Sequence, residues 1–189
     1  TQPSEWKRFE KQCNSDPYKK FYKCFEDAVQ MNGLLSVMRH GFKHRGIDFK
    51  VCYFKPESTL NTAAVERYKQ NVCQCIRQWH YSEQNNKSID MMLAINGIPV
   101  VAIELKNQLT GQTVDNAKLQ WQYDRDQREP AFWLNHRILA YFAVDLYEAW
   151  MTTELKGTDT YFLPFNQGSN GAGHVGGKGN PPNPDGYQT

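Results

Sequence analysis

Two apolar segments separated by Asn96-Gly97 constrain the fold of this chain more than any other feature. Residues 89–95 and 98–105 each read as a strand, and Asn-Gly between two such segments is the strongest short-range signal for a β-hairpin. The second segment is apolar throughout residues 98–103, which is typical of a buried strand. The chain is therefore expected to fold around a sheet that contains this hairpin.

Further strands and helices are expected on both sides of the hairpin. Asp16 followed by Pro17 is a helix start, and Asn32-Gly33 supplies the end of that helix. Other strands are expected at residues 47–54, 72–79 and 138–144, and other helices at residues 61–70 and 114–125. This order predicts an α/β (α+β) fold in which helices flank a mixed central sheet.

Size and charge limit the classes of function. The 189 residues are enough for one sizeable core, and a net charge of +2 excludes a global polycation, so a nucleic-acid site would have to be local. One local candidate is the basic stretch 39–45, expected to be a loop, in which Arg39, Lys43 and Arg45 have no acidic neighbour. It is either a solvated turn or a phosphate-contacting loop. Every apolar run is too short for a membrane span.

The ends of the chain and its cysteines suggest where the protein resides. Five cysteines cannot all pair within one chain, and the first ten residues lack the apolar core of a signal peptide. We expect a cytoplasmic protein with reduced thiols, of which this sequence is a fragment. From residue 166 the chain is rich in Gly and Pro, as a loop or interdomain linker is. Gly177-Lys178 lacks the flanking residues of a phosphate-binding loop.

Charged residues stand at the ends of the two hairpin strands. Asp90 begins the first strand, and Glu104-Leu105-Lys106 ends the second, where Glu104 and Lys106 share a face because side chains alternate. Two acids and an ammonium group at the end of a buried strand are costly to desolvate unless they bind something. A hard divalent cation such as Mg²⁺ takes one or two carboxylates and leaves room for a phosphate. Lys106 would then orient or deprotonate the attacking water and offset charge at phosphorus.

The register of the hairpin tests this interpretation. A strict two-residue turn at Asn96-Gly97 places Asp90 opposite Ile103, which sends Glu104 to the other face. A loop longer by one residue places Asp90 opposite Glu104. The metal hypothesis therefore predicts a bulge or a longer loop near Gly97, or a bulge further along either strand.

A second triple in the chain has the same spacing. Asp145 is followed by Glu154-Leu155-Lys156, but Gly157 comes next and no long apolar run precedes the triple. We interpret it as a solvated strand end. A nuclease site built on Asp145, Glu154 and Lys156 remains an alternative.

Short motifs in the same order along nearly the whole chain resemble one known family. They are Arg39-His40-Gly41, Ser88-Ile89-Asp90, Asn96-Gly97-Ile98-Pro99-Val100, Glu104-Leu105-Lys106-Asn107, Thr110-Gly111-Gln112-Thr113, Asp124-Arg125-Asp126, Phe142-Ala143-Val144-Asp145, Met151-Thr152-Thr153 and Phe162-Leu163-Pro164-Phe165-Asn166. In these motifs and in its Gly-rich tail the sequence resembles the N-terminal nuclease domain of the restriction (R) subunit of type I restriction-modification enzymes.

The resemblance implies a PD-(D/E)xK restriction-endonuclease-like fold that cuts double-stranded DNA with Mg²⁺, for which Mn²⁺ can substitute. Asp90, Glu104 and the backbone carbonyl of Leu105 would hold the metal, and Lys106 would be the catalytic lysine. Residues 1–165 would form the nuclease domain, and residues 166–189 would lead to an ATP-dependent translocase of the same chain, the only place where ATP binds. The complex would also contain methyltransferase and specificity subunits, in the cytoplasm of a bacterium or archaeon, and would cut far from its recognition sequence.

The sequence departs from the family pattern in three places. Ile89 stands where a Pro often precedes the first Asp. Related nucleases carry Gln-x-x-x-Tyr on the helix after the lysine. Here Gln120 matches the Gln, but Asp124 occupies the position of the Tyr, and Tyr123 comes one residue before it. We expect Gln120 and Tyr123 to support the site or contact DNA. The usual upstream segment is not in the sequence, so weak activity or none is expected of the isolated fragment.

The alternative function is a non-catalytic DNA-binding or docking module coupled to a motor.

Overall fold

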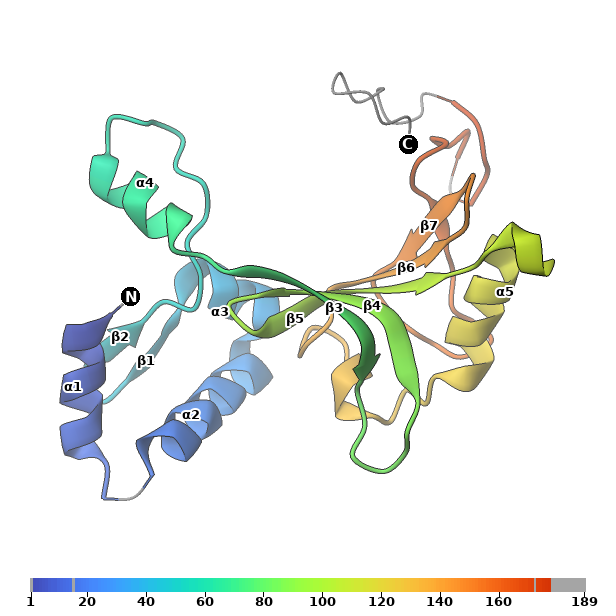
Figure 1. Cartoon of the computed structure of the whole chain (residues 1–189). Coiled ribbons are helices and arrows are strands. Elements are labelled where there is room, and N and C mark those ends of the chain that lie inside the picture. Colours follow the sequence, from blue (N-terminus) through green and yellow to red (C-terminus); the bar gives the residue numbers. More distant parts are fainter. Residues whose placement is uncertain (1, 15, 172, 178–189) are drawn as a thin grey trace. The chain divides into compact units, whose positions relative to one another are not determined.

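The computed structural model describes residues 2–14, 16–171 and 173–177, which form two compact units. Unit 1 comprises Thr1–Gln74 and Ile95–Ile98, and unit 2 comprises Cys75–Ala94 and Pro99–Thr189. The helices are α1 (Pro3–Gln12), α2 (Pro17–Asn32), α3 (Leu34–His40), α4 (Thr62–Lys69) and α5 (Val114–Leu119) (Figure 1). The strands are β1 (Phe42–His44), β2 (Ile47–Phe49), β3 (Cys73–His80), β4 (Ser88–Ile95), β5 (Ile98–Leu105), β6 (Ala140–Val144), β7 (Ala149–Thr152) and β8 (Leu163–Pro164).

Unit 1 contains helices α1 to α4 and the β1–β2 hairpin, against which α1 and α2 pack. The side chain of Asp16 accepts hydrogen bonds from the Tyr18 and Lys19 amides at 2.9 and 3.3 Å, so the predicted start of α2 is confirmed. The core is aromatic: Phe9 and Phe21 both meet Phe49 edge-on, at centroid distances of 5.5 and 5.1 Å. This packing holds α1 and α2 against the hairpin.

The basic stretch 39–45 differs from its predicted loop. Arg39 lies in the last turn of helix α3, Lys43 lies on strand β1, and Arg45 lies in the turn between β1 and β2. The alternation of buried Phe42 and Phe49 with exposed neighbours favours a strand pair here. Strand β2 also ends at Phe49, earlier than the predicted residue 54.

Asn96 and Gly97 form the turn between β4 and β5, as the sequence predicts. Both have positive φ, +52° and +81°, which a two-residue type I′ turn requires. The longer loop near Gly97, one of the routes by which the metal hypothesis would place Asp90 opposite Glu104, is therefore absent. The Asn96 side chain anchors the turn: its Oδ1 accepts from the Val72 amide at 2.7 Å, and its Nδ2 donates to the Val51 carbonyl at 2.8 Å and to Asn71 Oδ1 at 3.1 Å.

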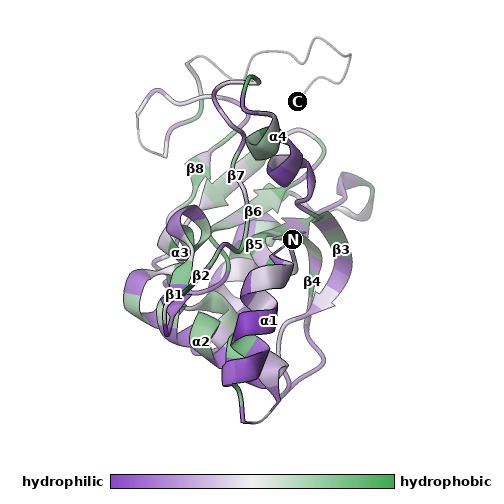
Figure 2. Cartoon of the chain, turned by 90° about the vertical axis from the view of Figure 1, so that its left-hand side faces the viewer, coloured by the Kyte–Doolittle hydropathy of each residue, from purple (hydrophilic) through white to green (hydrophobic). Residues whose placement is uncertain are grey.

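The main sheet has the strand order β3-β4-β5-β6-β7-β8. Strand β6 pairs with β5 in parallel, with Ala143 beside Glu104, whereas β6 with β7 and β7 with β8 are antiparallel. The sheet is therefore mixed, and the predicted α+β class with helices beside a mixed sheet is confirmed. Strand β3 stands at one edge and carries mostly hydrophilic residues (Figure 2).

The core of unit 2 joins the sheet to the helix that follows it. Ile89, Ala102 and Tyr141 from the strands pack with Ala117 and Trp121 from the helical segment. The Trp121 indole nitrogen donates to the Phe142 carbonyl at 2.9 Å, which ties the helix to β6. Helix α5 continues directly into a π-turn, Gln120–Asp124, so the helix predicted at 114–125 is confirmed, with its second half wound more loosely. Short 3₁₀ turns lie at Gln108–Thr110 and Pro130–Phe132.

All five cysteines are free. Within the residues described, no helix combines the length and the apolar character needed to cross a membrane. The expected linker is described only to residue 177, where it consists of bends and turns with one bridge between Ser169 and Val175. Lys178 and the residues after it lie outside the described part of the chain.

Candidate active site

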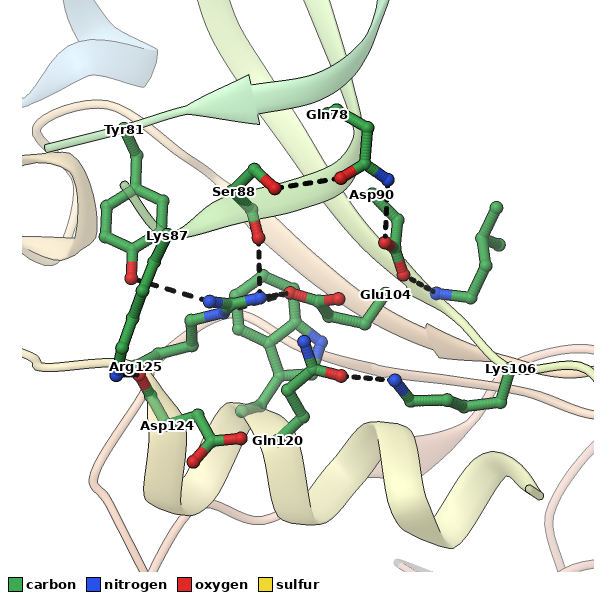
Figure 3. Close-up of polar contacts among 12 residues, drawn as sticks. Gln78, Tyr81, Lys87, Ser88, Asp90, Glu104, Lys106, Gln120, Asp124 and Arg125 are labelled. Atoms are coloured by element: carbon green, nitrogen blue, oxygen red, sulfur yellow. Dashed lines mark hydrogen bonds and ion pairs between the residues drawn. The ribbon is translucent and has the colours of Figure 1, made fainter. Parts of the chain in front are cut away.

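Strands β4 and β5 bring the two acidic residues of the predicted triple close together. Asp90 lies on β4, Glu104 is the penultimate residue of β5, and Lys106 follows that strand (Figure 3). The Asp90 carboxylate accepts a hydrogen bond from the Leu105 backbone amide at 2.8 Å, so the Asp90 side chain reaches the residue between the other two members. The Asp90 carboxylate also lies close enough to Glu104 to affect its pKa, although the turn has only two residues.

Glu104 is completely buried and is held through one of its two oxygens. Its Oε1 accepts from Nε of Arg125 at 2.9 Å and also from Nη2 of Arg125. Its Oε2 is buried and has no hydrogen-bond partner among the described residues. Burial raises the pKa of Glu104 to about 7; Arg125 opposes this rise, and the nearby Asp90 carboxylate adds to it. A buried carboxylate oxygen without a donor is a site where a proton or a cation would be stabilised.

The side chains of Lys106 and Gln120 are in contact. The Lys106 ammonium donates to Gln120 Oε1, which fixes the lysine side chain over the first residue of the π-turn. Tyr123 differs from Gln120: it is 68% exposed, and no described contact of this cluster involves it. Whether Tyr123 contacts DNA therefore stays a prediction.

Arg125 is a site residue to which the sequence analysis assigned no role. Its Nη2 also donates to the Ser88 carbonyl at 2.8 Å, and its Nη1 lies 3.5 Å from the Tyr81 hydroxyl. Its guanidinium carbon lies 5.5 Å from the centre of the Tyr81 ring and 5.9 Å from that of Trp121. A signal was available, because a glutamate at the end of an apolar strand needs a cationic partner and an arginine follows the next helix.

Gln78 is the second residue that sequence reasoning missed. Its Nε2 donates to Asp90 Oδ1 at 3.1 Å, and its Oε1 accepts from the Ser88 hydroxyl at 2.8 Å. Its φ is +49°, a left-handed conformation inside strand β3 that turns the side chain toward Asp90. Nothing in the local sequence indicates this irregularity.

The donor set fits a hard divalent cation. No group of three or more His, Cys, Asp or Glu side chains that could hold a metal occurs in the described part of the chain. Mg²⁺ needs only one or two carboxylates, because water and phosphate supply its other ligands. Asp90 provides one such ligand, and Glu104 Oε2, which accepts no hydrogen bond from a described residue, provides the other. The carbonyl of Leu105 as a third ligand stays a prediction.

The competing triple is engaged elsewhere. The Asp145 carboxylate accepts from the amides of Tyr147, Glu148 and Val114, at 2.8, 2.8 and 2.9 Å. Glu154 pairs with Lys156 at 2.8 Å, in a partly exposed ion pair. Asp145 therefore caps a turn and the start of α5, as a structural residue does.

The three basic residues predicted to contact phosphate all belong to unit 1. Arg39 and Arg45 are exposed, and Lys43 forms an exposed ion pair with Asp48 at 3.3 Å. Such an exposed pair is weak and leaves the lysine free to exchange partners. That Arg39, Lys43 and Arg45 contact DNA phosphates stays a prediction.

Comparison with known proteins identifies the family to which these residues belong. No curated protein and no solved structure matches the chain. A family model described as the type I restriction enzyme R protein N terminus matches residues 3–161, which cover most of each unit and every residue of the site above. The chain therefore belongs to the family of type I restriction enzyme R protein N-terminal regions.

Proposed function

We propose that unit 2 carries the metal-dependent endonuclease site of a type I restriction enzyme R subunit, which hydrolyses phosphodiester bonds of double-stranded DNA. The observation that carries the proposal is the buried Oε2 of Glu104, which has no hydrogen-bond partner within the described part of the chain. Glu104 lies near Asp90 and two residues before Lys106. A fold without a ligand for that oxygen would leave a buried acceptor unsatisfied, which costs about 1–3 kcal/mol.

Each side chain has a distinct task in this proposal. Asp90 and Glu104, with the Leu105 carbonyl, would hold Mg²⁺ or Mn²⁺. The cation, when bound, would polarise the scissile phosphate and stabilise its transition-state charge. Lys106 would orient or deprotonate the attacking water and offset negative charge at phosphorus. Gln120 accepts a hydrogen bond from the Lys106 ammonium and would thereby hold the lysine side chain in one orientation.

The proposal extends to the assembly in which this domain works. Membership of the R protein family supports a role in a complex with methyltransferase and specificity subunits, with cleavage remote from the recognition sequence after ATP-driven translocation. ATP would act at the translocase, to which residues 166–189 would lead. A cytoplasmic location follows from that role.

Substitution of the lysine tests the catalytic assignment. In the intact subunit complex, Lys106→Ala is expected to translocate DNA and to lose cleavage, because translocation uses a different part of the complex. Lys156→Ala is the matched control, since Lys156 stands in the competing triple, and it should cut normally. Undiminished cleavage by Lys106→Ala would defeat the assignment.

A second function has one observation in its favour. Arg125 already pairs with Glu104, so the buried charge is compensated without a cation, as in a domain that only binds DNA or docks onto a motor. Calorimetric titration with Mg²⁺ or Mn²⁺ separates the two functions. Binding that disappears in Glu104→Ala supports the enzyme, and no binding by the unaltered chain supports the docking module.

A further inference from the structure

Arg125 pairs with Glu104 in an unusual way, because both of its hydrogen bonds go to the same carboxylate oxygen. An arginine beside a carboxylate commonly forms two parallel hydrogen bonds, one to each oxygen. Here Nε and Nη2 both donate to Oε1, and Oε2 receives none among the described residues. An arginine that merely neutralised Glu104 would gain from covering both oxygens, so this geometry leaves one oxygen open.

The guanidinium group is fixed by contacts that do not depend on Glu104. The Ser88 carbonyl accepts from Nη2 at 2.8 Å, and the side chain is only 3% exposed between the rings of Tyr81 and Trp121. Ser88 begins strand β4, two residues before Asp90. Arg125 therefore holds Glu104 in a fixed relation to the strand that carries the other carboxylate.

Glu104 needs such a support because of its own burial. A fully buried carboxylate without a partner would be neutralised or would turn away from the apolar core. A partner that contacts a single oxygen offsets part of the cost of burying the charge and keeps the side chain in one rotamer. Groups that orient metal ligands in this way reduce the reorganisation that binding requires.

We propose that Arg125 is a positioning residue, which grips Glu104 by Oε1 and thereby presents Oε2 to the divalent cation before the cation arrives. This inference rests on the proposed function, because it concerns the same cation site. Arg125 itself touches neither the cation nor the DNA in this account.

The test measures metal binding by the whole 189-residue chain, independently of DNA cleavage. Arg125→Lys keeps the positive charge but loses the two-pronged grip, so Mn²⁺ affinity measured by calorimetry is expected to fall about 10- to 100-fold. Arg128→Lys is the matched control: Arg128 is exposed, pairs only with nearby Asp126 among its described contacts, and should leave the affinity unchanged. Circular dichroism at the titration temperature shows whether each variant is folded.

A second variant separates positioning from general support of the fold. Arg125→Ala leaves a space that methylguanidinium can occupy, so adding this small cation is expected to restore part of the lost Mn²⁺ affinity. Lysine-like cations without the planar group, such as methylammonium, should restore less. If Arg125→Lys is unfolded without metal, Mn²⁺ is added: refolding at concentrations that saturate the unaltered chain would overturn the proposal, and refolding only at concentrations about 10- to 100-fold higher would support it.

The possible results also distinguish this inference from the proposed function. No Mn²⁺ binding by the unaltered chain would refute the endonuclease site itself. Mn²⁺ binding by the unaltered chain together with equally tight binding by Arg125→Lys and Arg125→Ala would refute only the role of Arg125. Weaker binding by both folded variants, with rescue by methylguanidinium, would support it.

Discussion

Gln78 adopts a backbone conformation that glutamine normally avoids, and its side chain explains why. With φ at +49°, the residue leaves the extended course of β3 and places its amide between Asp90 and Ser88. A left-handed conformation costs an ordinary residue about 1–2 kcal/mol. The fold accepts this strain where it orients a carboxylate of the candidate site, as strained backbone at functional sites commonly does.

Two substitutions at Gln78 separate strain from contact. Gln78→Ala and Gln78→Gly both lose the hydrogen bond to Asp90, but only glycine adopts positive φ without strain, so the glycine variant should be more stable by about 1 kcal/mol. Arg77, which has no positive φ, is the matched position, and there the order should reverse. Urea unfolding of the four variants checks both orders, and equal stability of the two Gln78 variants would contradict the strain.

The raised pKa of Glu104 predicts how the stability of the metal-free chain depends on pH. Because the folded pKa is about 7 and the ordinary value is 4.5, the folded chain binds a proton that the unfolded chain releases between those values. This contribution is fully present below pH 4.5 and is lost as the pH rises to about 7. The slope is at most about 1.4 kcal/mol per pH unit.

Urea unfolding of metal-free protein across this pH range measures the effect. Glu104→Gln removes the titrating group and keeps the shape of the side chain, so the difference in stability between the variant and the unaltered chain should change with pH. A difference that stays constant from pH 4.5 to 7 would show that Glu104 does not titrate there.

Among the secondary-structure elements, those with a strong pattern were predictable and those shaped by the site were not. The hairpin at Asn96-Gly97 and the helix after Lys106 follow from turn chemistry and helical spacing. The π-turn at Gln120–Asp124 does not, because its looser winding arises where Gln120 and Arg125 each contact a residue of the β4–β5 region. Asp90 and Glu104 were expected to approach each other through a longer loop or a bulge. In the structure the turn has two residues, and the Asp90 carboxylate accepts a hydrogen bond from the Leu105 amide.

Asp145 links three elements, and its removal should weaken the fold without disturbing the metal site. Its carboxylate accepts backbone hydrogen bonds from Val114 at the start of α5 and from Tyr147 and Glu148 before β7. Asp145→Ala leaves those amides without their acceptor and should cost about 1–3 kcal/mol. Asp159→Ala, at an exposed position, is the control for thermal unfolding.

Titration of Asp145→Ala with Mn²⁺ tests whether the competing triple binds metal. At a temperature where Asp145→Ala is folded, its Mn²⁺ affinity should equal that of the unaltered chain. Loss of Mn²⁺ binding by the folded variant would revive a site built on Asp145, Glu154 and Lys156.

The two units of the chain differ in charge, which the total of +2 conceals. Unit 1 contains 13 Lys and Arg against eight Asp and Glu, a net +5, whereas unit 2 contains nine against 12, a net −3. Sequence alone could not reveal this division, because residues 95–98 belong to unit 1 although they lie between segments of unit 2. A site that hydrolyses DNA would gain from a positively charged unit in the same chain.

This difference predicts which cations contribute to DNA affinity. If Arg45 contacts phosphate, Arg45→Gln should weaken binding to any duplex and lower the slope of log affinity against log salt by about 0.9. Arg128→Gln, in unit 2 and already paired with Asp126, should leave the slope unchanged. Fluorescence anisotropy over a series of salt concentrations measures both, and an unaltered slope for Arg45→Gln would exclude that contact.

The anchored Asn96 has a consequence for the chemical ageing of the purified protein. An asparagine before glycine is prone to deamidation, which replaces its NH₂ group by an oxygen. At this position the new oxygen would face the Val51 carbonyl and Asn71 Oδ1, which now accept from Nδ2 at 2.8 and 3.1 Å. Three acceptor oxygens would then lie together without a donor between them. Deamidation during storage is therefore expected to destabilise the turn between β4 and β5.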